Sequence, residues 1–130
     1  FYSGFPTGVN ASRVAAEVFA SRSLPVGDER FPGAPYLDDL IDGLVYGETW
    51  NRNQLSVRDR SLATIAVTLA GYQSDQLRVH LQRGLDNGVT VQEISELIAH
   101  VTLYSGFPTG VNASRMFADI LRERGIPLPD

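Results

Sequence analysis

Two histidines are the residues best suited to acid–base chemistry in this chain. Its 130 residues contain only His80 and His100. Glu96 and Tyr104 lie four residues before and after His100, so on a helix the three side chains share one face. His80 lies on the preceding helical segment, and the short connection at residues 88–89 predicts antiparallel neighbours. We hypothesise that both histidines face one pocket; a structural role for each is the alternative.

The residue types argue against thiol chemistry, metal binding, phosphate binding and a serine nucleophile. Cysteine is absent, which removes disulfides, thiolate metal ligands and thiol-based catalysis. Two histidines and a carboxylate would suit zinc or iron, but the chain has no His-x-x-x-His or His-x-x-Glu-His spacing, so we expect no metal. No glycine-rich phosphate loop follows a strand, and no Ser-His-Asp order stands out.

The overall composition describes an ordinary acidic globular chain. Hydrophobic residues make up 43% and charged residues 20%, with a net charge of −4 and a pI near 5.1. This balance predicts no nucleic-acid partner. No apolar run reaches the roughly 18 residues that span a membrane, and no signal-peptide pattern is present. We therefore expect a cytoplasmic protein, and the initial Phe1 suggests that the start of the gene product is missing.

A twelve-residue segment occurs twice without a single difference. Residues 2–13 read Tyr-Ser-Gly-Phe-Pro-Thr-Gly-Val-Asn-Ala-Ser-Arg and recur as residues 104–115. This repeat predicts the end of one domain copy followed by a complete second copy. We assign residues 1–22 to the closing helix of the preceding copy, 23–35 to a Pro- and Gly-rich linker, and 36–130 to the domain. The first copy has no counterpart of either histidine, so the chain holds at most one site.

Helical periodicity dominates the sequence, and no segment alternates with a period of two residues. Apolar stripes predict helices at residues 10–22, 36–46, 57–70, 74–87 and 91–104, and after Pro108 to about residue 124. The segment 57–70 is apolar nearly all round and should be buried. Ser74 and the Thr90/Glu93 capping box are expected helix starts, and Gly88 is an expected helix end. The predicted class is all-α, a compact bundle of about six helices.

Several separated motifs resemble the carboxymuconolactone decarboxylase family, which includes the AhpD-like peroxidases. In chain order they are Tyr46-Gly-Glu-Thr-Trp-Asn-Arg52, Arg58-Asp-Arg-Ser-Leu62, His80, Gly88-Val-Thr-Val-Gln-Glu-Ile94, His100 and Tyr104-Ser-Gly-Phe-Pro108. The resemblance covers most of the chain and implies an AhpD-like helical bundle. It also implies a homo-oligomer, a trimer or hexamer, and a tandem two-domain form would account for residues 1–22.

The resemblance separates two chemistries. The redox branch uses Cys-x-x-Cys with a histidine four residues later, and here those positions read Gln73-Ser-Asp-Gln76 and His80. Glutamine cannot exchange disulfides, so a thiol peroxidase is excluded. The resemblance therefore implies the cysteine-free, decarboxylase-like branch. Its reference reaction removes CO₂ from 4-carboxymuconolactone to give 3-oxoadipate enol-lactone, without a cofactor.

Candidate roles follow from the needs of such a reaction on a small-molecule carboxylate. Arg58 is the candidate for binding the carboxylate, with Arg52 and Arg60 as competitors. The proton donor and the stabiliser of negative charge are His80 and His100, in an order that stays open. The remaining candidates are Glu48 to orient a histidine, Tyr104 to donate a hydrogen bond, and Trp50 to contact substrate or, alternatively, to anchor packing. Two other hypotheses remain: a non-catalytic oligomerising domain, and an isomerase or hydrolase on the same scaffold.

Overall fold

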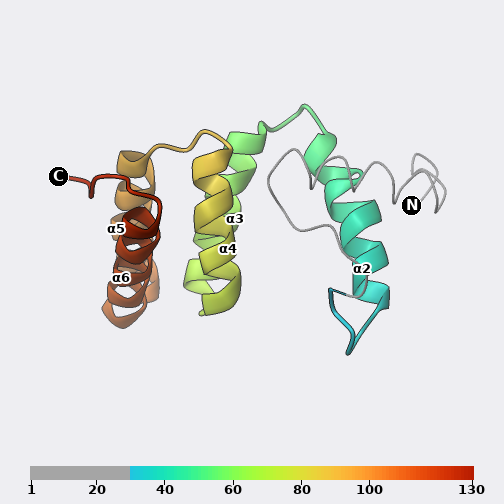
Figure 1. Ribbon diagram of the computed structural model, residues 1–130, viewed down its shortest axis with the longest axis horizontal. Helices are drawn as coiled ribbons and strands as arrows, with labels where there is room; N and C mark the ends of the chain where they lie inside the picture. The colour runs from blue at the N-terminus through green and yellow to red at the C-terminus, as the bar shows by residue number, and fades with distance from the viewer. Residues whose placement is uncertain (1–29) are drawn as a thin grey trace. The chain divides into compact units, whose positions relative to one another are not determined.

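The computed structural model describes residues 30–130, and the regular structure in that range is entirely helical. The all-α class is thereby confirmed. The predicted helix at 10–22 and the first copy of the repeated segment lie outside the described residues. The chain divides into two compact units, Phe1–Ser56 and Val57–Asp130, and each is described by itself (Figure 1). None of the helices within residues 30–130 is both long and apolar enough to cross a membrane.

The described part of the first unit contains three short helical elements. They are α2 (Tyr36–Leu40), the π-helical turn η1 (Ile41–Tyr46) and the 3₁₀ turn η2 (Thr49–Asn51). Arg30 forms ion pairs with Asp38, at 3.2 Å, and with Asp42. These pairs tie the residues before α2 to one face of the α2–η1 helix. The helix predicted at residues 36–46 is confirmed, with a wider turn over its second half.

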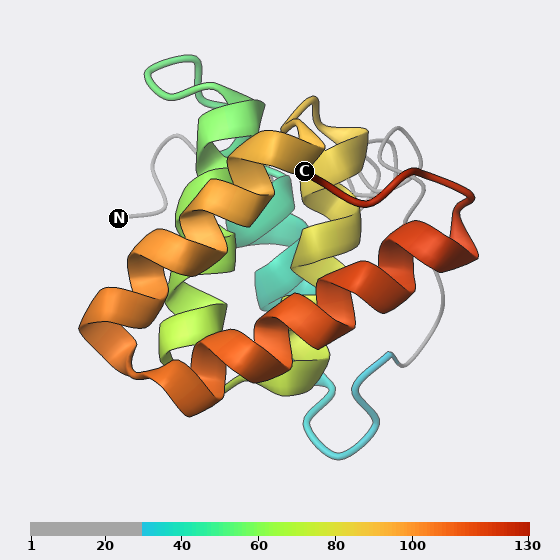
Figure 2. The same cartoon turned by 90° about the vertical axis from the view of Figure 1, so that its left-hand side faces the viewer.

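The second unit is a bundle of four helices. They are α3 (Val57–Ala70), α4 (Ser74–Asp86), α5 (Val91–Ser105) and α6 (Phe107–Glu123). The central helix α3 packs against the other three, and α5 and α6 form a helical hairpin (Figure 2). The fully buried side chains of the bundle include Ile65, Leu69, Leu81, Ile94, Ile120 and Leu121.

Local capping signals place most of the helix ends where the sequence predicted them. The Thr90 hydroxyl accepts a hydrogen bond from the Glu93 amide at 3.1 Å, and the Glu93 carboxylate accepts one from the Thr90 amide at 2.9 Å. Gly88 has a φ of 96°, as expected of a residue that ends a helix. Ser74 is the exception: it lies inside α4, and Gln73 precedes the helix without a side-chain cap.

The prediction that α3 is buried all round is wrong for the described structure. Ile65 and Leu69 are fully buried, but Val67 is 69% exposed and Ala63 and Ala70 are also exposed. The partners of α3 within the second unit pack on the face that carries Ile65 and Leu69. An apolar helix in a bundle this small therefore keeps one face open.

The corner between α5 and α6 depends on two glycines and a proline. Gly106 has a φ of 110°, which a residue with a side chain rarely adopts, and Pro108 lies in the first turn of α6. One turn later, Gly110 packs directly on Thr102 of α5. A Cβ added to Gly110 would lie 2.8 Å from the Thr102 Cβ and closer still to its hydroxyl oxygen. The helices approach so closely here because Gly110 has no side chain.

Gly110→Ala should therefore destabilise the protein by about 1–3 kcal/mol, because a methyl group must force the two helices apart. The measurement is urea unfolding followed by far-ultraviolet circular dichroism. Gly33→Ala is the matched control, since a Cβ at Gly33 meets nothing within 4 Å. We expect the control to change the unfolding free energy by less than about 0.5 kcal/mol. Equal stability of the two variants would contradict the close packing at Gly110.

Candidate active site

A groove of about 870 Å³ lies between α5 and α6 and reaches the C-terminal segment. Both helices and the tail contribute apolar walls, formed by Ile98, Leu103, Phe107, Val111, Phe117, Leu121 and Leu128. Three ionisable side chains also line it: Glu96 and His100 from α5, and Arg115 from α6. The groove thus combines an apolar wall with one acid, one base and one cation, all from the second unit.

His100 lies on the exposed side of α5, where its ring is available to a ligand in the groove. Tyr104 follows one helical turn later, and the two ring centroids are 5.3 Å apart at an interplanar angle of 48°. Glu96 lies one turn before His100 and lines the same groove. The predicted stripe of three side chains therefore exists as a structural feature. Tyr104 is 82% exposed and is not among the residues that line the groove, so its role as a hydrogen-bond donor to substrate stays a prediction.

His80 has a different environment. Its side chain on α4 is only 8% exposed, and its Nδ1 atom is buried without a hydrogen-bond partner. Burial, which is the larger cause, and the nearby charge of Arg83 together lower the pKa of His80 from 6.5 to about 4. The imidazole is therefore neutral at neutral pH.

Within the described residues, the groove that contains His100 does not meet the hypothesis that both histidines face one pocket. His80 is absent from the lining of the groove that contains His100. The physical reason is the packing of α4, which lies against α3 and α6, whereas the groove is formed by α5 and α6. A short connection between two helices does not by itself turn their polar residues toward each other.

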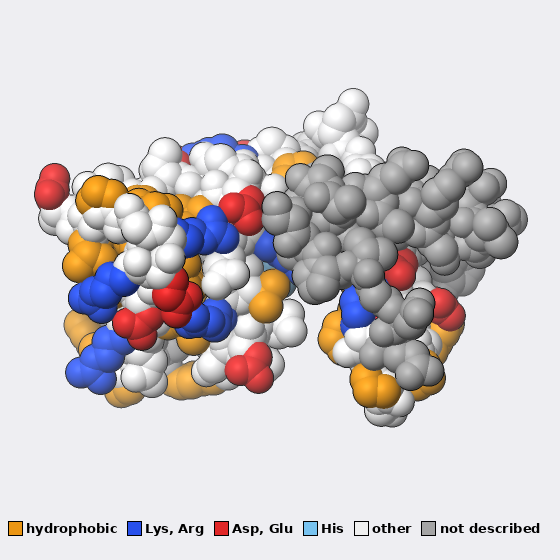
Figure 3. Space-filling model, viewed as in Figure 1, with side chains coloured by type: hydrophobic (Ala, Val, Ile, Leu, Met, Phe, Trp, Pro, Cys, Tyr) orange, Lys and Arg blue, Asp and Glu red, His pale blue; other side chains and the backbone are white. Residues whose placement is uncertain are grey.

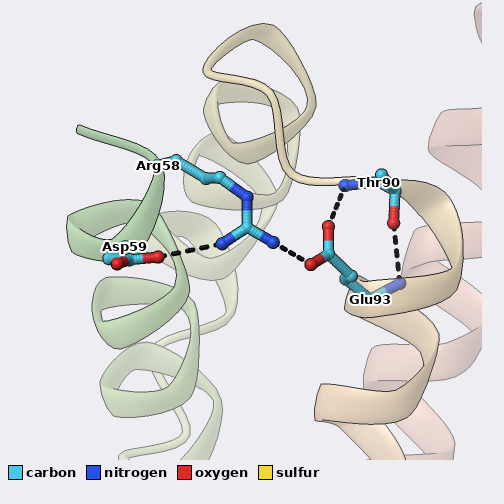
Figure 4. Close-up of polar contacts among 4 residues, drawn as sticks. All are labelled: Arg58, Asp59, Thr90 and Glu93. Atoms are coloured by element: carbon cyan, nitrogen blue, oxygen red, sulfur yellow. Dashed lines mark hydrogen bonds and ion pairs between the residues drawn. The ribbon is translucent and has the colours of Figure 1, made fainter. Parts of the chain in front are cut away.

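Arg58 is engaged in ion pairs at the start of α3 (Figure 4). Its Nη1 donates to the Asp59 carboxylate at 2.9 Å, and its Nη2 donates to the carboxylate of Glu93. Glu93 also accepts from the Thr90 amide, so Arg58 joins the start of α3 to the capping box of α5. A substrate carboxylate would have to compete with two protein carboxylates for this guanidinium. The role of Arg58 in binding substrate stays a prediction.

Glu48 and Trp50 belong to the first unit, whereas both histidines belong to the second. Glu48 is half-buried and directly precedes η2. Trp50 is 7% exposed, and its ring stacks on Tyr46 with centroids 5.5 Å apart. This contact agrees with the alternative of a packing anchor for Trp50. The proposed roles of Glu48 beside a histidine and of Trp50 beside substrate stay predictions.

Sequence reasoning missed the contribution of α6 to the groove. Phe107, Val111, Ser114 and Ala118 line it, and Arg115 lies beside them. The three- and four-residue spacing of the first set was a readable signal for one helix face. No group of His, Cys, Asp or Glu within the described range is arranged to hold a metal ion.

The buried state of His80 predicts a pH-dependent contribution to stability. In the unfolded chain the histidine takes up a proton near pH 6.5, whereas in the folded chain it does so only near pH 4. Its contribution is present in full above pH 6.5 and is lost as the pH falls toward 4, by up to about 3 kcal/mol. His80→Gln should therefore reduce the loss of unfolding free energy between pH 7 and pH 5, measured by urea unfolding.

A matched control for this measurement is Gln76→Ala, an exposed position one turn earlier on α4. It should keep the pH dependence of the wild type. If His80→Gln also keeps the wild-type pH dependence, the imidazole is not buried in its neutral form, and the account of α4 is wrong.

Comparison with known proteins agrees with the family resemblance of the motifs. Residues 35–119 match the model of the carboxymuconolactone decarboxylase family, a range that crosses the division between the two units. A 4-carboxymuconolactone decarboxylase of Acinetobacter baylyi is 42% identical over 88 residues, which cover 68% of this chain and 66% of that protein. The nitrosuccinic acid decarboxylase npaB of Metarhizium robertsii is 32% identical over 75 residues, 58% of this chain and 52% of that protein.

The chain therefore spans less than two thirds of the length of these relatives. The family match alone covers more than half of the chain, and it includes both histidines and most of the groove. On this evidence, the chain belongs to the carboxymuconolactone decarboxylase family.

Proposed function

We propose that this protein is a cofactor-free decarboxylase of small carboxylic acids, and that the groove between α5 and α6 is its substrate site. The observation that carries the proposal is the position of His100, which lies in a mostly apolar groove within the part of the chain that matches the family. A concave apolar surface with a few polar groups is the usual form of a small-molecule site. The names of two relatives supply the reaction class.

The two named substrates share the chemistry that makes the loss of CO₂ possible. In each, the electron pair of the breaking C–C bond can move into an acceptor, the conjugated lactone carbonyl in one case and the nitro group in the other. The carboxylate leaves as neutral CO₂, and the remaining carbanion takes up one proton. The reaction needs no oxidant or reductant, so the protein must supply a proton and hydrogen bonds to the developing negative charge.

Within the groove, His100 is the group that we assign to proton transfer. It is exposed to the groove, whereas His80 is buried and neutral at neutral pH because its pKa is lowered to about 4. Tyr104, which contacts the His100 ring but is not among the residues that line the groove, is the proposed donor of a hydrogen bond. In this proposal, His80 supports the packing of α4 and does not transfer the proton. A trimeric or hexameric assembly, a tandem two-domain form and a cytoplasmic location stay predictions.

His100→Gln should lower kcat by about 100- to 10,000-fold, the usual effect of removing a general acid. The assay follows the loss of ultraviolet absorbance of 4-carboxymuconolactone, with released CO₂ measured in parallel and 2-nitrosuccinate as a second substrate. Gln92→Ala is the matched control, because Gln92 is exposed on the same helix and does not line the groove. It should retain wild-type turnover.

Three outcomes would count against the proposal in different ways. No turnover of either acid by the wild type would overturn the assignment of substrates and favour a non-catalytic domain. Product formed without CO₂ would favour an isomerase or hydrolase. Loss of turnover in His80→Gln together with normal turnover in His100→Gln would move the site from the α5–α6 groove to α4.

A further inference from the structure

We infer that Arg115 binds the carboxylate that the substrate keeps, and that the natural substrates of this groove are therefore dicarboxylic acids that become monocarboxylic acids. The inference rests on the proposed function, because it takes the α5–α6 groove as the substrate site. It goes further by naming the residue that selects the substrate and the part of the substrate that this residue recognises.

Among the described residues that line the groove, Arg115 has the one cationic side chain. It has no ion pair or hydrogen bond with any described residue, which sets it apart from other arginines of its unit. Those are paired: Arg58 with Glu93, Arg78 with Glu123, Arg122 with Asp119, and Arg124 with Asp86. Figure 3 shows one face of the molecule, on which basic and acidic side chains of the second unit lie next to one another. The guanidinium of Arg115 thus has its full hydrogen-bonding capacity available to a ligand.

The reaction itself decides which carboxylate this cation can hold. A leaving carboxylate loses its charge as it becomes CO₂, so an ion pair with it would weaken on the way to the transition state. Such an ion pair would stabilise the substrate more than the transition state and would slow the reaction. A retained carboxylate keeps its charge throughout. An arginine in the site is therefore compatible with catalysis when it holds the retained carboxylate.

The charges of the groove also orient the substrate. Arg115 belongs to α6, whereas Glu96 and His100 belong to α5. The negative charge of Glu96 repels a carboxylate from the α5 side, and Arg115 attracts it to the α6 side. The retained carboxylate then lies on α6, and the reacting carbon faces His100 across the groove. Both named relatives act on acids that fit this arrangement, since loss of one carboxylate leaves another behind.

An interaction that is equally strong in the substrate and in the transition state changes KM and leaves kcat nearly unchanged. Arg115→Gln should therefore raise KM for 4-carboxymuconolactone by about 10- to 100-fold, the usual size of a charge-assisted hydrogen-bonded pair, with kcat changed by less than about 3-fold. Arg115→Lys should give an intermediate KM, because lysine keeps the charge but loses the two-pronged geometry.

Two arginines offer matched controls for these kinetics. Arg122→Gln removes an arginine from the same helix at a position outside the groove. Arg13→Gln removes the arginine that occupies the same place in the repeated segment. Both variants should keep the wild-type KM. The inference would be overturned if Arg115→Gln left KM unchanged. It would also be overturned if Arg58→Gln raised KM by about 10- to 100-fold while Arg115→Gln did not.

A second measurement separates this inference from the proposed reaction, because it needs no turnover. The imidazole signals of His100 are followed by NMR while succinate is added to the full chain, with monomethyl succinate as the control ligand. We expect a saturable shift with succinate that weakens by about 10-fold or more in Arg115→Gln and that is weaker for the monoester. Succinate binding without turnover would reject the decarboxylase and keep the anion site.

Two other results of the succinate titration would overturn the inference. Equal succinate affinity of the wild type and Arg115→Gln would overturn the role of Arg115 even if the decarboxylase assay succeeds. No response of His100 to either ligand, together with a groove covered by a second copy of the chain, would show that this surface is an interface and would overturn the inference as well.

Discussion

The close approach of α5 and α6 at Gly110 and Thr102 is the contact on which the candidate site depends. A Cβ at Gly110 would lie 2.8 Å from the Thr102 Cβ, so the backbone of α6 meets the Thr102 side chain at a distance that only glycine permits. The turn at Gly106 reverses the chain just before this contact. Beyond it the helices enclose a groove with His100 on one wall and Arg115 on the other. The repeated segment contains both the glycine that brings the helices together and the arginine proposed to select the substrate.

The two histidines differ in burial, and this difference gives them different roles in the proposal. An imidazole in the position of His80 has lost most of its contact with water, and the pKa of His80 falls to about 4 mainly for that reason, with a smaller effect of the Arg83 charge. It can support the packing of α4, but at neutral pH its imidazole is uncharged and lacks the second proton that a general acid would donate. His100 lies at the groove, next to the ring of Tyr104. Two residues of the same type thus have different chemistry because one lies on a buried helix face and the other on an open one.

The sequence predicted best those features that local chemistry decides. The limits of α3, the Thr90/Glu93 capping box and the positive φ of Gly88 depend on neighbouring residues, and each is seen in the structure. Features that depend on helix packing were harder to predict from the sequence. The open face of α3, the separation of His80 from His100 and the engagement of Arg58 by Glu93 all involve residues distant in sequence. Arg115 was readable as part of a repeat, but its position in a groove becomes visible only when α5 and α6 are paired.

The central claim is that small dicarboxylic acids bind between α5 and α6. A crystal structure of the full chain with bound succinate tests it most directly, because it locates the ligand without requiring turnover. The account predicts density in the groove, with one carboxylate within hydrogen-bond distance of the Arg115 guanidinium and the other end of the ligand facing His100. Density beside His80 or Arg58, with the α5–α6 groove filled by a neighbouring copy, would contradict it.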